Sequence, residues 1–169
     1  AAATGARSGE LRALHWSDLD GGTLTINRTV QRRAGEWTFP EPKTARSRRA
    51  IPLPVFAVEA LSSWRTRQRR ERLAAGDTWV GDKWGGLIFA DETGAPLAAE
   101  VAVRSFQAAL AAAGLDRSRL HDLRHAAATN LLVAGVPIHV VSQLMGHASI
   151  TVTANVYGHV TTDAKRDAA

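Results

Sequence analysis

The first third of the chain alternates between apolar and polar positions in short stretches, which is typical of β-strands. In residues 21–30 (GGTLTINRTV), a Gly-Gly turn comes before a run rich in β-branched side chains. Residues 35–40 (GEWTFP) and 47–54 (SRRAIPLP) have the same character, and the loop PEPKTARS between them contains prolines that suit a turn or a sheet edge. The pattern predicts a small antiparallel sheet over residues 22–53.

From residue 54 onward, apolar side chains recur at helical spacing, and glycines mark the ends of the helices. A long helix is expected to end at Gly76, and its inward face is expected to consist of Val55, Val58, Leu61 and Leu73. Further helices are expected over residues 98–114, 118–135, 137–146 and 149–160.

Two shorter segments complete the pattern. Near the N-terminus, Ser8 is a candidate N-cap for a helix that has Glu10 in its first turn. Residues 87–90 (LIFA) are expected to form a short strand or an extended stretch. The predicted fold class is therefore mainly α with a small antiparallel β-sheet (α+β).

Composition limits the classes of protein that remain. The 169 residues can form one domain with its own core, and 45% hydrophobic and 22% charged residues are typical of a globular chain. The chain contains no cysteine, which excludes disulfides and thiolate metal sites. It has no signal-like N-terminal segment and no apolar run near the ~20 residues that span a membrane, so we expect a cytoplasmic protein.

The net charge of +5 is concentrated in one part of the chain. Residues 28–72 contain 12 Lys or Arg and 4 Asp or Glu, whereas the remainder has 9 basic and 12 acidic residues. A concentrated basic surface suits a polyanion such as DNA, although a solvated arginine-rich helix face has the same composition. Candidate phosphate contacts are Arg46, Arg48, Arg65, Arg69 and Arg72.

The motif HDLRH places His121 and Arg124 three residues apart on one predicted helix face. Arginine can hold two oxygens of an anion, and histidine can donate or relay a proton, so this pair suits an anionic site. His121 and His125 also have the spacing of metal ligands, but the sequence places no third ligand near them. We therefore expect no metal site.

Three further groups could contribute to the same chemistry. Arg7 precedes a predicted helix N-terminus, where it can hold an anion or form an ion pair with Glu10. Lys43 lies in the loop between two predicted strands, and His147 follows the glycine that ends a predicted helix. Tyr157 is the only tyrosine, and a phenol needs a nearby base or a charge-neutralised phosphate to act as a nucleophile.

Together these motifs resemble the tyrosine recombinases, also called the phage integrase family. The matching segments occur in the order that the family has, namely TGARSGELRALHWSDLD, PKTARSRRAIPLP, HDLRHAAAT and MGHASITVTANVYGHV. The resemblance implies the catalytic-core fold of the DNA breaking-rejoining enzymes. It implies that residues 1–169 are a catalytic domain without its first helices and without the N-terminal DNA-binding domains that family members carry.

The resemblance also implies a role for each candidate residue. Arg7, Lys43, His121, Arg124 and His147 would activate a phosphodiester that Tyr157 attacks, and Glu10 would support Arg7. The implied activity is site-specific DNA recombination or integration through a 3′-phosphotyrosyl intermediate, without a cofactor. The implied partners are double-stranded DNA and further copies of the protein, as a tetramer on DNA in a full-length parent.

Two alternatives remain open at the level of sequence. A type IB topoisomerase uses the same catalytic plan and differs in its assembly. The second alternative is a DNA-binding fragment without catalysis. Such a fragment would need no nucleophile, and the complete set of candidate catalytic side chains argues against it.

Overall fold

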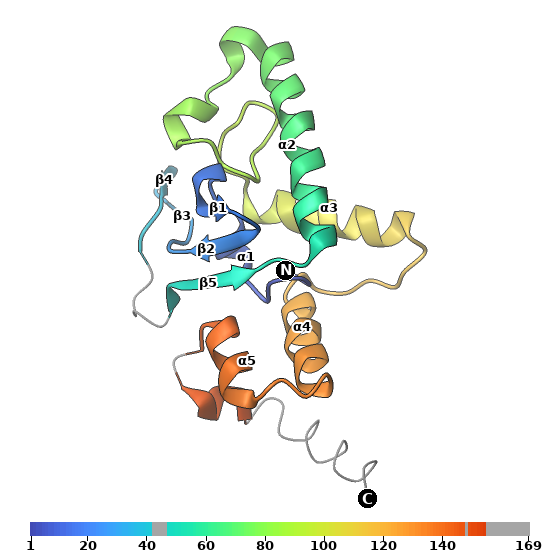
Figure 1. Ribbon diagram of the computed structural model, residues 1–169. Coiled ribbons are helices and arrows are strands. Elements are labelled where there is room, and N and C mark those ends of the chain that lie inside the picture. Colours follow the sequence, from blue (N-terminus) through green and yellow to red (C-terminus); the bar gives the residue numbers. More distant parts are fainter. Residues whose placement is uncertain (42–46, 148, 155–169) are drawn as a thin grey trace, which may run out of the picture.

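The computed structural model describes residues 1–41, 47–147 and 149–154. In Figure 1 the strands lie between α2 above and α4 and α5 below. The elements are α1 (Ser8–Leu11), η1 (Trp16–Asp18), β1 (Leu19–Asp20), β2 (Thr23–Ile26), β3 (Gln31–Arg33), β4 (Glu36–Thr38), β5 (Arg49–Pro52), α2 (Val55–Ala75), η3 (Gly76–Thr78), η4 (Gly81–Trp84), α3 (Ala99–Ala112), α4 (Asp122–Val133) and α5 (Ile138–Met145). These elements confirm the predicted fold class.

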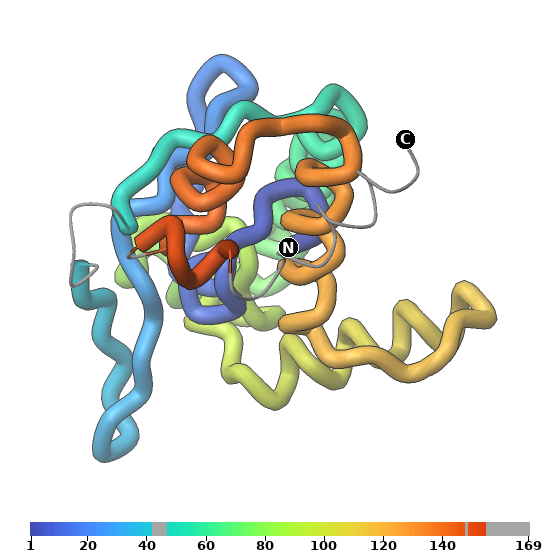
Figure 2. The backbone as a smooth tube through the Cα atoms, turned by 90° about the horizontal axis from the view of Figure 1, so that it is seen from below, coloured from blue at the N-terminus to red at the C-terminus, as the bar shows by residue number. Residues whose placement is uncertain are grey.

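The strands form two sheets, so the prediction of one sheet over residues 22–53 was wrong. The first sheet has the antiparallel order β1-β2-β5, and the second is the β3-β4 hairpin, which projects from the body in Figure 2. The predicted strand over residues 21–30 ends at Ile26 because Asn27 and Arg28 turn to donate hydrogen bonds to the buried carboxylate of Asp18. The chain thus leaves the first sheet before it enters the second.

The first core lies on the inward face of the three-stranded sheet. Leu24 of β2 is paired with Ile51 of β5, and both are buried together with Ile26 and with Ile88 from the extended segment. Residues 87–90 do not form a strand and make only isolated bridges, one of which joins Leu87 to His15. The sheet therefore provides a rigid surface against which both α2 and the N-terminal segment are fixed.

Helix α2 ends at Gly76 as predicted, but its inward face was predicted correctly only in part. Val55 and Leu73 are 73% and 83% exposed, whereas Leu61 and Trp64 pack against the core and Gln68 is buried. Only the middle of the helix lies against the core, so the apolar side chains at its two ends are left exposed. Within the part of the chain that the structure describes, no helix is both long and apolar enough to cross a membrane.

A second core joins α4 to α5 through Ala128, Leu132, Val141 and Met145. Helix α5 begins after Pro137 and stops before Gly146, as predicted. Helix α4 begins at Asp122, later than the predicted range of 118–135. The reason is local: the Asp122 carboxylate accepts hydrogen bonds from Ser118 and from Arg119, which holds the preceding residues in a turn.

The first helix differs from its prediction in both length and cap. Helix α1 has one turn, and its N-cap is Arg7 rather than Ser8. The backbone N–H of Arg7 donates to Glu10 Oε2 at 2.8 Å, so a carboxylate of the chain itself satisfies this helix end. A negative charge of the chain itself therefore already lies at this end of α1.

Gln68 gives a test of how α2 is attached to η1 and to the extended segment 87–90. Its Oε1 accepts from Trp16 Nε1 at 2.7 Å, and its Nε2 donates to the carbonyls of Leu87 and Ile88. Gln68→Leu removes the partner of Trp16 Nε1 and of the Leu87 carbonyl, while Ile88 O keeps its bond from Trp64 Nε1. We therefore expect a loss of about 1–3 kcal/mol in the free energy of unfolding, measured in urea. Arg70→Leu, at an exposed position of the same helix, should change it by less than ~0.5 kcal/mol. Equal losses for the two variants would contradict the inference that the hydrogen bonds of Gln68 hold α2 in place.

Candidate functional site

The site is organised around the C-terminal end of α5. The helix stops because Gly146 adopts a left-handed conformation, with φ of 63°. The carbonyls of residues 144, 145 and 146 then accept hydrogen bonds from three arginines that come from different segments. Arg49 Nε donates to Leu144 O at 2.7 Å, Arg124 Nη2 to Met145 O at 2.7 Å, and Arg7 Nη2 to Gly146 O at 3.2 Å. Because a helix C-terminus carries partial negative charge, it favours these cations.

Arg7 is held from its other side by Glu10. The ion pair between Arg7 Nη1 and Glu10 Oε1 is 3.0 Å long, and the Arg7 side chain remains 43% exposed. Burial would raise the pKa of Glu10, but the hydrogen bond and charge of Arg49, followed by Arg7, outweigh burial and hold this pKa below its usual value. Arg7 is therefore fixed in place but still reachable from solvent.

Sequence analysis missed Arg49, which lies at the start of β5. Its side chain is only 6% exposed and grips Glu10 with two bonds, from Nη2 to Oε2 at 2.8 Å and from Nη1 to Oε1 at 3.2 Å. Strand alternation could have found it, because Arg49 lies two residues before the buried Ile51 and so shares its inward face. An arginine on the inward face of a strand indicates a buried acidic partner.

Arg124 is the most deeply buried arginine of the site. It lies in the first turn of α4, is 4% exposed, and donates to the carbonyls of Gly5 and Met145. It thereby fastens the segment before α1 to the end of α5. Arg7 and Arg124 reach the same turn from opposite ends of the sequence, which brings the two predicted catalytic arginines together.

His147 directly follows this turn, and its Nδ1 lies 2.7 Å from the hydroxyl of the fully buried Thr153. Burial, together with the positive charges of Arg124, Arg7 and Arg49, lowers the pKa of His147 to about 4. The ring is therefore neutral at physiological pH. A neutral ring bonded to a hydroxyl through one nitrogen can present the other nitrogen to a ligand.

His121 is the N-cap of α4 and is exposed, so it precedes the helix on whose face it was expected. Its ring lies edge-on to that of His125, with 4.8 Å between the centroids. Burial and the charges of His125 and Arg124 lower the pKa of His121. Among the residues with a described placement, no three His, Cys, Asp or Glu side chains lie close enough together to hold a metal ion.

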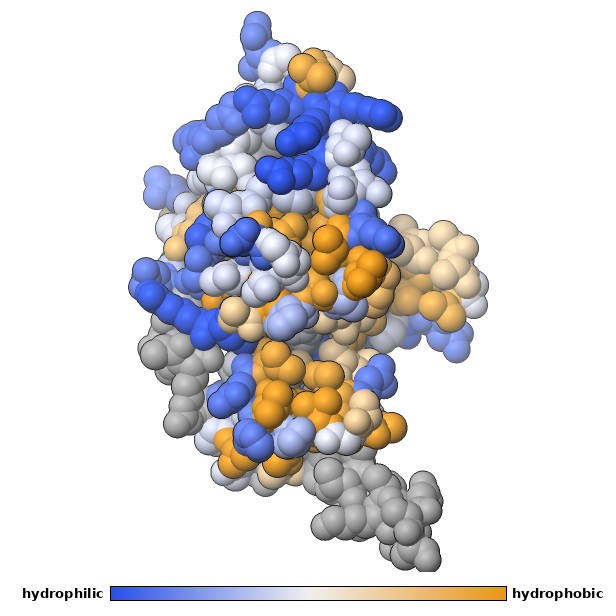
Figure 3. Space-filling model, in the orientation of Figure 1, coloured by the Kyte–Doolittle hydropathy of each residue, from blue (hydrophilic) through white to orange (hydrophobic). Residues whose placement is uncertain are grey.

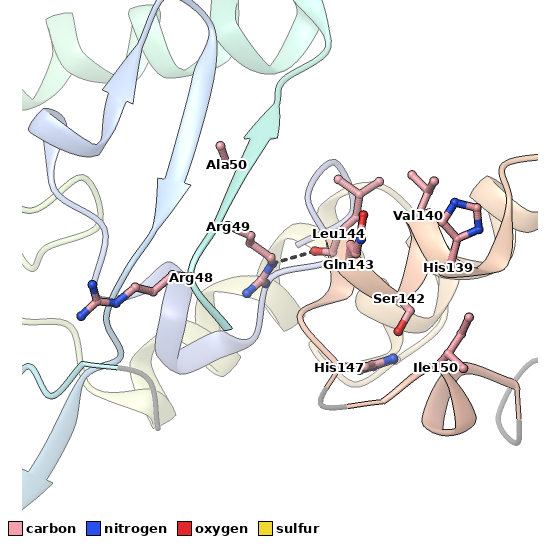
Figure 4. A pocket seen from close by; sticks show the side chains of 10 residues that line it. All are labelled: Arg48, Arg49, Ala50, His139, Val140, Ser142, Gln143, Leu144, His147 and Ile150. Carbon is pink, nitrogen blue, oxygen red and sulfur yellow. Dashed lines mark hydrogen bonds between the residues drawn. The ribbon is translucent and has the colours of Figure 1, made fainter. Parts of the chain in front are cut away.

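A hollow of about 570 Å³ opens beside His147, between β5 and α5. In Figure 4, Arg49 at the start of β5 and Arg48 just before it line one side, and His139, Gln143 and His147 line it from α5 and the following turn. Arg48 forms an exposed ion pair with Glu41. The hollow therefore extends from the turn at Gly146 to a basic, solvent-exposed surface at Arg48.

The remaining predicted residues fall into two groups. Lys43, Arg46 and Tyr157 lie outside the described residues. Arg65, Arg69 and Arg72 line a different hollow, on α2, where Arg65 stacks over Trp16 at 5.0 Å and Arg72 pairs with Asp82 at 2.7 Å. This end of α2 is strongly hydrophilic in Figure 3. The structure thus places these three arginines apart from the turn at Gly146.

Comparison with known proteins adds independent evidence. The model of the phage integrase family matches residues 1–164. The XerC-like tyrosine recombinase of Caldanaerobacter subterraneus subsp. tengcongensis is 35% identical, over 98% of this chain and 45% of the relative. An integrase of Streptomyces ambofaciens is 38% identical, over 91% of this chain and 41% of the relative. The chain thus spans less than half the length of these two relatives.

Solved structures show the same relationship. The Tn1549 transposon integrase, in complex with transposon right end DNA, superposes with a TM-score of 0.78 and 25% identity, over 98% of this chain and 54% of that one. The XerA recombinase superposes with a TM-score of 0.73 at 24% identity, over 98% of this chain and 51% of that one, which supports the fold.

Gly146 and Gly114 form a matched pair for testing the turn. Both have left-handed backbones, with φ of 63° and 67°, so alanine is strained at either position. A Cβ at Gly146 would lie 2.6 Å from Arg49 Nη1, whereas one at Gly114 would meet nothing within 4 Å. We expect Gly146→Ala to destabilise the chain by about 1–3 kcal/mol more than Gly114→Ala in urea unfolding, because it displaces Arg49 from its buried partners. Equal losses would mean that Arg49 does not brace the turn.

The lowered pKa of His147 predicts a pH dependence of stability. The folded pKa of about 4 lies below the ordinary value of 6.5, so the folded state binds fewer protons between these values. Stability from this source is complete above pH 6.5 and is lost as the pH falls toward 4. His147→Asn should therefore lose less stability than the wild type between pH 7 and pH 5, measured by urea unfolding. An NMR titration midpoint of His147 above pH 6 would show that burial and the neighbouring arginines do not lower its pKa.

Proposed function

The chain belongs to the phage integrase family, and on that premise we propose that residues 1–169 are the catalytic domain of a site-specific DNA recombinase. The proposed reaction cuts and rejoins double-stranded DNA through a 3′-phosphotyrosyl intermediate. The observation that carries it is the convergence of Arg7, Arg124 and His147 on the single turn at Gly146. This turn gathers two guanidiniums and an imidazole from three separate segments.

The charges of this turn suit a phosphodiester under attack. As a phenolate approaches in line, negative charge builds up on the non-bridging oxygens, and catalysis consists mainly of positioning and electrostatic stabilisation. Arg7 keeps a partly exposed guanidinium, and Arg7 and Arg124 donate to adjacent carbonyls of the turn. In the proposed reaction these two groups hold the non-bridging oxygens. His147 donates a further hydrogen bond through the ring nitrogen that Thr153 does not occupy.

Proton transfers complete the proposed chemistry. His121 acts as the general base or proton relay for the Tyr157 hydroxyl, which its lowered pKa favours because a base must be unprotonated. Lys43 protonates the departing 5′ oxygen. Attack by the Tyr157 oxygen on phosphorus forms the phosphotyrosine as the bond to the 5′ oxygen breaks. A second 5′-hydroxyl then reverses the step without a nucleotide cofactor.

Double-stranded DNA is the proposed partner. The Tn1549 integrase is described in complex with transposon right end DNA, and a lambda integrase dimer is described bound to a core site. The basic residues Arg46, Arg48, Arg65, Arg69 and Arg72 are proposed to contact phosphates. Exchange of strands between two duplexes requires several active centres, so we propose a homotetramer on DNA, acting in the cytoplasm.

Covalent trapping on DNA tests this proposal. A nicked suicide duplex that loses its 5′-hydroxyl fragment should leave the protein joined to DNA, as a slower band on a denaturing gel. We expect the band to form in EDTA and to disappear in Tyr157→Phe. Arg124→Ala should slow its formation by about 10²–10³-fold, because it removes one donor to the developing charge.

The outcomes separate the alternatives. If Tyr157→Phe still forms an adduct, Tyr157 is not the nucleophile, and if the wild type binds the duplex without forming one, the chain is a binding module. Relaxation of supercoiled DNA without exchange between two sites would favour a topoisomerase. Loss of the adduct in EDTA would indicate that a metal ion takes part.

A further inference from the structure

We propose that Arg49 is a positioning residue of the reaction, which shares the negative charge of Glu10 so that Arg7 can attract the phosphate, and which fixes the turn that presents His147. The inference rests on the proposed function. Arg49 acts through its neighbours: its donors are directed to Glu10 and to the carbonyls of Leu144 and Ser47.

The first part of the argument is charge balance around Glu10. Each carboxylate oxygen accepts from both arginines, Oε1 from the Nη1 atoms of Arg7 and Arg49, and Oε2 from the Arg7 backbone and Arg49 Nη2. One negative charge is thus shared between two guanidiniums. If Arg49 were absent, the buried carboxylate would have Arg7 as its remaining cationic partner in this group. Arg7 would then be neutralised by Glu10 and would attract a phosphate less strongly.

The second part is geometric. Arg49 Nε donates to Leu144 O at 2.7 Å, and the same guanidinium packs where a Cβ of Gly146 would be. Figure 4 shows this bond as a bridge from β5 to the end of α5, on the wall of the hollow that His147 also lines. A single side chain thereby fixes the distance between the sheet and the turn. A shift of ~1 Å in catalytic groups can cost about 10²-fold in rate.

The third part concerns the adjacent loop. Arg49 Nη1 also donates to Ser47 O at 3.1 Å, and Ser47 is the first described residue after residues 42–46, which include Lys43. Arg49 therefore also holds the backbone directly before its own strand, on the side where Lys43 precedes it in the sequence.

The test measures the single-turnover rate of adduct formation at saturating suicide DNA, with the full chain. Arg49→Met removes the charge and the donors, and we expect the rate to fall by about 10²-fold. Arg49→Lys restores the charge with fewer donors, so its rate should lie between those of the wild type and Arg49→Met. Arg104→Met removes the same charge from an exposed position on α3 and should react within about twofold of the wild type.

The decisive variant combines Glu10→Gln with Arg49→Met. If Arg49 counterbalances Glu10, removing both charges frees Arg7, and the double variant should react at least about tenfold faster than Arg49→Met alone. A double variant no faster than the single one would overturn the inference, because it would mean that the charge of Glu10 does not restrain Arg7 when Arg49 is absent. So would an Arg49→Met rate within twofold of the wild type.

Two controls keep the outcomes distinct. Circular dichroism checks that each variant folds. If Arg49→Met does not fold, the rate of Arg49→Lys is compared with that of the wild type instead. An unchanged rate then overturns the inference, and a reduced rate supports it. If the wild type itself forms no adduct, the proposed function fails, and the inference fails with it. An active wild type beside unaffected Arg49 variants overturns the inference alone.

Discussion

The rest of this structure depends on how the last turn of α5 is satisfied. A helix end leaves carbonyls without partners, and burying them unpaired costs free energy. Here three arginines supply the donors, and they come from the N-terminal segment, from β5 and from α4. The requirement of one helix end therefore decides where three distant parts of the chain meet. It also explains why so much positive charge is tolerated in a partly buried place: each guanidinium has a carbonyl or carboxylate within hydrogen-bonding distance.

The two cores of the molecule are joined at the same place. Leu144 packs against both the sheet cluster and the α4–α5 cluster, while its carbonyl accepts from Arg49. Apolar packing and charged hydrogen bonding thus converge on one residue. The apolar contacts bring α5 close to the sheet without fixing its orientation, because hydrophobic attraction has little directionality. The arginine bonds are directional and set the rotation of the turn, and with it the direction of His147.

Much of this could be predicted from the sequence, and the failures have physical reasons. Gly146 ends α5 as predicted because a left-handed helix cap needs glycine, which is a local property. The inward face of α2 was predicted only in part: Leu61 packs against the core, but Val55 and Leu73 lie beyond it, and no local pattern shows how far a core extends. The motif residues Arg7, Arg124 and His147 could be found from their order along the chain. The order of the motifs does not reveal Arg49, because its role depends on a partner 39 residues away, Glu10.

The long separations within the arginine-held turn have a consequence for the newly made protein. Arg7 and Gly146 are 139 residues apart, Arg124 and Gly5 119, and Arg49 and Leu144 95. At about 5–20 residues per second, a ribosome needs on the order of 10 s to go from Arg7 to Gly146. During that interval Arg7 has been made without the carbonyl of Gly146, and Arg49 without that of Leu144. The turn can therefore form only after both sheets and the helices α1 to α4 have been synthesised.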